Sequence, residues 1–176
     1  MDNVFYILSI MSELKYSPKR RTGNLGEDIA ELFLAGCGYK IIDRNYLKKF
    51  GEIDIIVEIS DTIRFIEVKS IVTRERNNGD CAIVSRDVSQ NSFTKDDFEI
   101  KVTQETSEDS DEYLPEDNVT YFKQRKLLRT IETYILEKNL DDNQEWQIDV
   151  ITVKIDFLNK TATIKHIENV IFEASR

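Results

Sequence analysis

The stretch GEIDIIVEISDTIRFIEVK, residues Gly51–Lys69, decides the fold of this chain. Two runs rich in β-branched residues, Glu52–Ile59 and Ile63–Lys69, flank a short polar break at Ser60–Thr62, a pattern typical of a β-hairpin. Side chains alternate between the two faces of a strand. One face of this hairpin is therefore predicted to be apolar and to form core: Ile53, Ile55, Val57, Ile59, Ile66 and Val68.

The opposite face carries three charged side chains at one end of the hairpin, those of Asp54, Glu67 and Lys69. A two-residue loop, Ser60-Asp61, places Asp54 opposite Glu67 with Cβ atoms about 4.5–5.5 Å apart. A loop shifted by one residue pairs Asp54 with Lys69 and keeps all three on this face. A three-residue loop would turn Asp54 into the apolar face, so the core pattern disfavours that register.

Two opposed carboxylates repel each other and bind protons more tightly unless a cation lies between them. Magnesium suits such a pair, because it takes oxygen ligands from one or two carboxylates together with water and phosphate. Lys69 is placed to orient a water molecule or to stabilise charge that develops on a phosphate. From spacing alone, the alternative is a solvated polar face with cross-strand ion pairs.

Asp54, followed after twelve residues by Glu67-Val68-Lys69, resembles the D…E-x-K core of the PD-(D/E)XK nuclease superfamily. More of the chain resembles one branch of that superfamily, the small bacterial YraN family. The E-x-K motif alone is weak evidence, whereas several blocks in family order are strong evidence. Six blocks keep that order: Gly23–Tyr46, Gly51–Ile56, Phe65–Lys69, Phe122–Leu136, Ile148–Val153 and His166–Phe172.

This resemblance implies a restriction-endonuclease-like α/β fold with an αβββαβ core and a mixed central sheet. It implies, by analogy, a metal-dependent nuclease that uses Mg²⁺ or Mn²⁺ on nucleic acid, with DNA as the first expectation. The implied metal ligands are Asp54, Glu67, the main-chain carbonyl of Val68 and Glu27, and Lys69 joins Asp54 and Glu67 as a catalytic residue. For Glu27, stabilisation of a helix N-terminus is the structural alternative.

A second helix is predicted at Val119–Lys138, where apolar residues recur at helical spacing and basic residues outnumber acidic ones. Its basic residues are expected to contact nucleic-acid phosphates, with a solvated basic face as the alternative. The family match at Lys123-Gln124 favours the first interpretation. The predicted contacts are Lys123, Gln124, Lys126 and Arg129.

The length of 176 residues and the hydrophobic content of 40% suit a single globular domain, which we place at residues 18–176. Residues 1–17 are predicted to form an amphipathic helix that packs on this domain, with a homodimer contact as the alternative. Asp2 precedes the apolar run, which is also too short to span a bilayer, so neither a secretory signal nor a membrane partner is expected. Two cysteines without metal-ligand spacing suit free thiols and a cytoplasmic location.

An acidic insertion at about residues 74–118 departs from the family, as does Ile71 at a position where the family carries arginine. Between Asp96 and Asp117, ten acidic residues face Lys101 alone, and this −9 equals the net charge of the whole chain. The main interpretation is a solvated, partly disordered loop with a short strand within Asp97–Val102. The alternative is a mimic of nucleic acid that covers the basic surface.

The remaining elements complete the fold. The first helix is predicted to begin with Asn24 as its N-cap and to end at Gly36, followed by a strand at Tyr39–Tyr46. Two last strands are predicted at Trp146–Ile155 and Thr161–Ile167. Asp149 is expected to pair with an arginine, and His166, the only histidine, is expected to be structural.

Two other classes of function stay open. One is a non-catalytic nucleic-acid-binding module that keeps the fold, and the other is a protein-interaction scaffold that uses the N-terminal helix and the acidic insertion.

Overall fold

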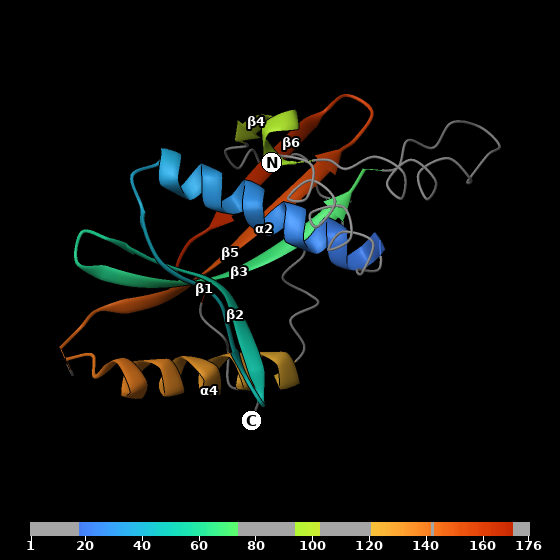
Figure 1. Cartoon of the computed structure of the whole chain (residues 1–176). Helices are drawn as coiled ribbons and strands as arrows, with labels where there is room; N and C mark the ends of the chain where they lie inside the picture. The colour runs from blue at the N-terminus through green and yellow to red at the C-terminus, as the bar shows by residue number, and fades with distance from the viewer. Residues whose placement is uncertain (1–17, 74–93, 103–120, 142, 171–176) are drawn as a thin grey trace, which may run out of the picture.

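The computed structural model describes residues 18–73, 94–102, 121–141 and 143–170. The predicted N-terminal helix and most of the acidic insertion lie outside these ranges. A mixed sheet lies between two helices, which gives an α/β/α sandwich (Figure 1). The elements in chain order are α2 (Pro18–Gly36), β1 (Lys40–Lys48), β2 (Gly51–Ile59), β3 (Thr62–Val72), the 3-10 turn η1 (Lys95–Asp97), β4 (Glu99–Val102), α4 (Tyr121–Lys138), β5 (Trp146–Asp156) and β6 (Thr161–Ile167).

The six strands follow the order β1-β2-β3-β5-β6-β4. The pairs β1–β2, β2–β3 and β5–β6 are antiparallel, whereas β3–β5 and β4–β6 are parallel. The αβββαβ core and the mixed sheet predicted from the sequence are therefore confirmed. The short β4 forms one edge of the sheet and lies within the stretch where the sequence predicts a strand.

The β2–β3 hairpin has the predicted two-residue loop. Ile59 pairs with Thr62, and the register continues to the pair Ile55–Ile66. Ser60 and Asp61 have φ angles of 49° and 63°. Positive φ at both loop residues is the geometry of a type I′ turn, whose twist matches that of the flanking strands.

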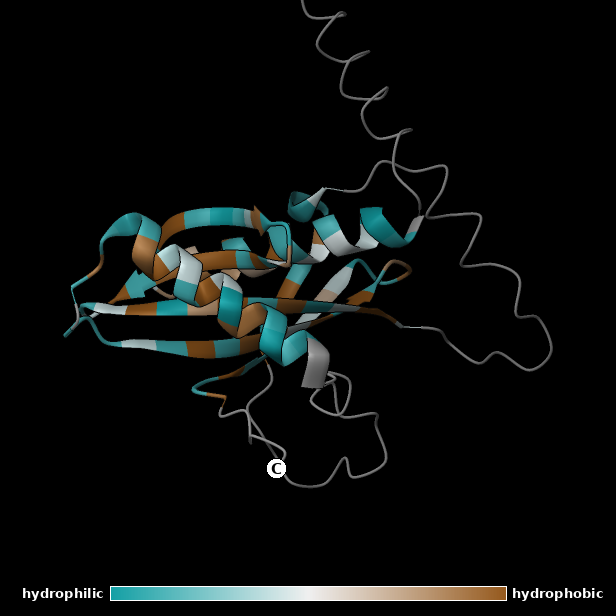
Figure 2. Ribbon diagram, turned by 90° about the horizontal axis from the view of Figure 1, so that it is seen from below, coloured by the Kyte–Doolittle hydropathy of each residue, from teal (hydrophilic) through white to brown (hydrophobic). Residues whose placement is uncertain are grey.

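Each face of the sheet has its own core. The core under α2 contains Ile29 and Leu34 of the helix with Ile55, Val57 and Ile66 of the hairpin. The core under α4 contains the helix residues Leu127, Ile131 and Tyr134, and from the sheet Ile53, Ile56, Ile63, Phe65 and Ile148. Figure 2 shows apolar and polar residues alternating along the helices and strands that enclose these cores.

Ile53 is a correction to the predicted alternation. Strict period-two alternation places Ile53 with Ile55, but Ile53 packs in the α4 core and Ile55 in the α2 core. The side-chain alternation of β2 is therefore broken across Asp54, the residue between them. A sequence pattern assumes a regular strand and cannot reveal such a break.

Helix α2 begins earlier than predicted. Pro18 is already helical, so Asn24 lies inside the helix and is not its N-cap. The predicted end of the helix is confirmed: Gly38, with a φ of 85°, follows Gly36. Tyr39 N–H donates to the Leu34 carbonyl and Gly38 N–H to the Ala35 carbonyl, which together form a Schellman motif.

Two glycines allow the helices to lie close to the hairpin. A Cβ on Gly26 of α2 would lie 1.7 Å from Ser70 Oγ of β3. A Cβ on Gly51, at the start of β2, would lie 2.8 Å from Thr130 Oγ1 and 3.2 Å from the Lys126 carbonyl oxygen of α4. These approaches hold α2 and the first half of α4 against the end of the hairpin that carries Asp54.

Candidate active site

The candidate site lies where the β2–β3 ladder ends. The last pair in the ladder is Ile55–Ile66, and Asp54 and Glu67 are the next residues in the same register. Beyond this point β3 remains paired with β5, where Glu67 lies beside Val150. Asp54 Oδ2 instead accepts a hydrogen bond of 2.7 Å from the backbone N–H of Val68. The hairpin therefore opens at the two carboxylates and leaves them side by side.

Both carboxylates are buried: Asp54 is 8% exposed and Glu67 is 5% exposed. Burial, followed by the negative charge of Glu67, raises the pKa of Asp54 to about 8. Glu27 adds a smaller effect in the same direction. The Val68 N–H and the Lys123 ammonium lower this pKa but do not offset the rise. The site is thus short of positive charge when both carboxylates are ionised.

Lys123, from the first turn of α4, is a cation that reaches the pair. Its Nζ donates to Glu67 Oε1. Burial acts to lower the pKa of Lys123, but the charges of Glu67, Asp54 and Glu52 outweigh it and raise the pKa. The structure therefore brings together residues that are 56 positions apart in the sequence.

Glu27 lies near the pair but has its own partner. Burial raises the pKa of Glu27, and the charge of Arg44, followed by a side-chain hydrogen bond with Asn45, opposes that rise. The negative charge of Glu27 in turn raises the pKa of Asp54. Within the described ranges, no three side chains of the types His, Cys, Asp and Glu gather closely enough to hold one metal ion. The metal role of Glu27 stays a prediction.

The other predicted site residues lie on β3 and α4. Lys69 is half-buried in β3 and pairs with Thr152 of β5. Gln124 is half-buried next to Lys123, and Lys126 and Arg129 continue along the exposed side of α4. The Arg129 guanidinium lies 4.6 Å from the centre of the Phe50 ring in the β1–β2 turn. Contacts of these side chains with nucleic acid remain predicted.

Asp149 is a third buried carboxylate of the sheet. Its oxygens accept hydrogen bonds from Arg64 Nη1 (3.2 Å), His166 Nε2 (3.0 Å), Gln147 Nε2 (2.7 Å) and the backbone N–H of Asn169 (2.8 Å). The predicted pairing of Asp149 with an arginine is confirmed, and His166 contributes to the same network. Burial acts to raise the pKa of Asp149, but the hydrogen bonds lower it overall.

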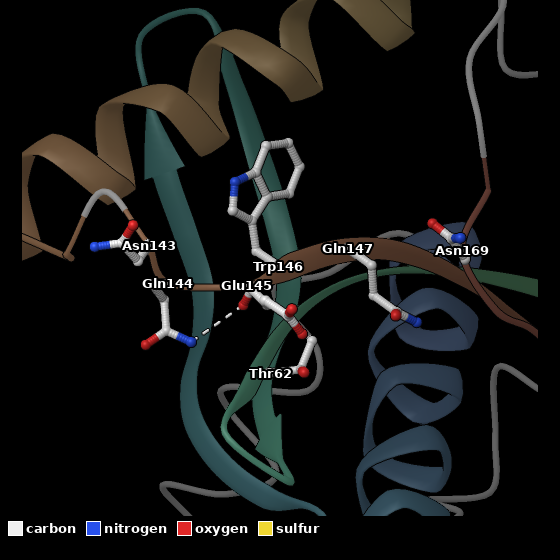
Figure 3. A pocket seen from close by; sticks show the side chains of 7 residues that line it. All are labelled: Thr62, Asn143, Gln144, Glu145, Trp146, Gln147 and Asn169. Atoms are coloured by element: carbon white, nitrogen blue, oxygen red, sulfur yellow. Dashed lines mark hydrogen bonds between the residues drawn. The ribbon is translucent and has the colours of Figure 1, made fainter.

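A hollow of about 500 Å³ lies at the other end of the hairpin (Figure 3). It is lined mainly by amide side chains and by the half-exposed Trp146. Three of these amides are already hydrogen-bonded inside the protein: Gln147 donates to Asp149, Gln144 to the Glu145 carbonyl and Asn143 to Asp141. The hollow does not contain the Asp54–Glu67 pair, so we place the candidate active site at the open end of the hairpin.

The sandwich, with a carboxylate pair where its central hairpin opens, defines a restriction-endonuclease-like α/β protein. No helix of the described part of the chain is both long and apolar enough to cross a bilayer. Comparison with known proteins then gives the family: the chain belongs to the YraN family, described as uncharacterised protein family UPF0102, whose model matches residues 26–94. This stretch includes Glu27, Asp54, Glu67 and Lys69.

Three relatives match over most of their length. The chain is 32% identical to a UPF0102 protein of Clostridium acetobutylicum over 151 residues, which cover 85% of this chain and 93% of the relative. It is 29% identical to a UPF0102 protein of Clostridium botulinum over 147 residues, covering 84% and 90%. A UPF0102 protein of Alkaliphilus oremlandii is 27% identical over 150 residues, covering 85% and 97%. The sequence resemblance to the family is confirmed.

Proposed function

We propose that this protein is a metal-dependent nuclease that hydrolyses phosphodiester bonds in nucleic acid, with DNA as the expected substrate. One observation carries the proposal: the buried carboxylates of Asp54 and Glu67 lie together, and the Lys123 ammonium contacts Glu67. Two neighbouring buried carboxylates are costly to keep ionised. A divalent cation removes that cost.

The residues fit Mg²⁺ or Mn²⁺. Such hard cations take oxygen ligands, and a site with one or two carboxylates leaves positions for water and phosphate. Asp54 and Glu67 supply the two carboxylates. The main-chain carbonyl of Val68 is the proposed third ligand, since the N–H of the same residue is bonded to Asp54. When bound, the cation lowers the pKa of a coordinated water and polarises the phosphate.

The side chains of the site have separate roles in the proposed reaction. Asp54 and Glu67 act in their ionised forms and hold the cation. Lys69 stabilises the negative charge that grows on the phosphate as the bond breaks. Lys123 and Gln124 contact the phosphate at the edge of the site, and Lys126 and Arg129 extend that contact along the exposed side of α4.

The test is cleavage of labelled branched, single-stranded and duplex DNA in the presence of Mn²⁺. We expect wild type to cleave at least one of these substrates and Asp54→Asn to lose about 100-fold or more of the rate, because it removes one ligand charge. Glu58→Gln is the matched control. Glu58 lies in the same strand but is paired with Lys40 at 2.8 Å, away from the site. Equal cleavage by wild type and Asp54→Asn would refute the proposal.

The basic side of α4 supports a second candidate, a nucleic-acid-binding module without catalysis. That function requires DNA affinity that is unchanged by chelation of metal and by Glu67→Gln. Binding measured by fluorescence anisotropy, with and without EDTA, separates the two.

A further inference from the structure

We propose that Lys123 is a metal-gated phosphate ligand: its ammonium neutralises Glu67 until a divalent cation displaces it, and only then is it available to a phosphate. This inference rests on the proposed function of the site, and it names how metal and nucleic acid depend on each other there.

The two partners of this ion pair differ in their freedom to move. The Glu67 side chain is 6% exposed and fixed in the central strand β3, whereas the Lys123 side chain is 52% exposed. Lysine carries its charge on a flexible four-carbon stem. The ammonium can therefore leave without disturbing the core, but the carboxylate cannot follow it. When the pair separates, Glu67 needs another cation in the same place.

A divalent cation and the Lys123 ammonium compete for the same carboxylate. Lys123 contacts Glu67 Oε1, and the charges of both Asp54 and Glu52 act on it as well. A divalent cation held by Asp54 and Glu67 satisfies both carboxylates and repels a nearby ammonium. Displacement moves the ammonium toward solvent at the edge of the site, because its helix stays docked through Gly51 and the α4 core.

Lys126, one turn further along α4, provides a contrast on the same helix. It is exposed, and within the part of the chain that the structure describes its Nζ has no carboxylate partner within 4 Å. Its charge is available to a phosphate whether or not metal is bound. Lys123 and Lys126 therefore predict different responses to the same divalent cation.

The physical consequence is a reciprocal coupling between the two ligands. If metal releases Lys123 to the phosphate, metal tightens nucleic-acid binding, and nucleic acid tightens metal binding by the same factor. Couplings of this kind are commonly between about 5-fold and 150-fold. Removal of the Lys123 charge should lower the factor, and removal of the Lys126 charge should leave it unchanged.

The first measurement is Mn²⁺ binding to the full chain without nucleic acid, followed by the electron paramagnetic resonance signal of free Mn²⁺. We expect Lys123→Met and Lys123→Gln to bind Mn²⁺ about 3-fold to 10-fold more tightly than wild type, because an ion-pair competitor is gone. Lys123→Arg, which keeps the charge, should remain close to wild type. Two neutral variants are used so that one remains if the other misfolds, which circular dichroism will reveal.

The second measurement is the affinity for a fluorescein-labelled single-stranded DNA, by anisotropy, in EDTA and in Ca²⁺. For wild type and Lys126→Met, the ratio of the two affinities should be the same, although Lys126→Met binds more weakly in both conditions. For Lys123→Met, the ratio should fall by about threefold or more.

The outcomes separate the inference from the proposed function. Unchanged Mn²⁺ affinity in both neutral variants, or an unchanged Ca²⁺-to-EDTA ratio in Lys123→Met, overturns the gating role and leaves a metal-dependent nuclease intact. Absence of Mn²⁺ binding in wild type and in every variant overturns the gating role and the metal-dependent function together.

Discussion

The carboxylate pair should make the protein less stable as the pH rises, and Asp54→Asn should remove that loss. Asp54 is 8% exposed, and burial together with the charge of Glu67 raises its pKa to about 8, whereas the ordinary value is 3.8. The native protein therefore keeps a proton that the unfolded chain releases near pH 4. Stability falls with pH wherever the native state binds more protons, here from about pH 4 to about pH 8.

The size of the effect follows from the same pKa. A difference of 1 between the folded and unfolded pKa values corresponds to about 1.4 kcal/mol. Ionisation of Asp54 therefore lowers the free energy of unfolding by several kcal/mol, at most about 6 kcal/mol. Asparagine has nearly the same shape and keeps an oxygen that can accept from the Val68 N–H, but it carries no charge. Asp54→Asn should therefore match wild type below about pH 4 and exceed it by several kcal/mol near pH 8.5.

The assay is urea unfolding at half-unit steps between pH 3.5 and pH 9 in EDTA, followed by circular dichroism. Glu58→Gln, in the same strand but paired with Lys40, serves as the control and should follow the wild-type curve. Added Mg²⁺ should restore wild-type stability at pH 8.5 and should do little for Asp54→Asn, since a ligand stabilises only the state that binds it. Parallel pH curves for wild type and Asp54→Asn would refute the electrostatic reasoning.

Two further predictions concern the frame around the site. Gly26→Ala should destabilise the protein by about 1–3 kcal/mol, because the new Cβ would lie 1.7 Å from Ser70 Oγ. Gly23→Ala on the same helix should stabilise it by about 0.5–1 kcal/mol, because its Cβ meets nothing within 4 Å and alanine favours the helix. Urea midpoints that move in the same direction for both variants would contradict this packing. Asp149→Asn should lower the free energy of unfolding by about 3 kcal/mol or more at pH 7, because Arg64 and the other donors lose a charged acceptor. Thermal melts should show this deficit shrinking below about pH 4, because the lowered pKa of Asp149 gives wild type a stability that protonation removes.

The hairpin can be predicted from the sequence because its determinants are local. A short polar break between two β-branched runs indicates a two-residue turn, and the apolar pattern then excludes a three-residue loop. These residues alone therefore predict that Asp54, Glu67 and Lys69 share one face at one end of the hairpin, but not whether Asp54 lies opposite Glu67 or Lys69. The hairpin keeps that register as far as the pair Ile55–Ile66. The order of helices and strands is predictable for the same reason, since each element has its own apolar period.

The departures arise where tertiary packing overrides the local pattern. Ile53 lies in the α4 core because side-chain alternation breaks across Asp54, and Asn24 lies inside a helix that already includes Pro18. The ion pair between Lys123 and Glu67 spans 56 residues. The family match indicates that Lys123 is near the site, but nothing in the sequence indicates which carboxylate it contacts.

Two buried aspartates of the same sheet show why one is structural and the other defines a site. Asp149 accepts four hydrogen bonds from Arg64, His166, Gln147 and the Asn169 N–H, and these lower its pKa despite its burial. Asp54 accepts one hydrogen bond, from the Val68 N–H, and faces a second carboxylate, so burial and repulsion raise its pKa instead. The difference lies in the donors that the fold supplies and not in residue type or depth. A buried carboxylate with few internal donors gains most from a cation provided from outside the chain, and that is the reason to propose metal binding at Asp54 and not at Asp149.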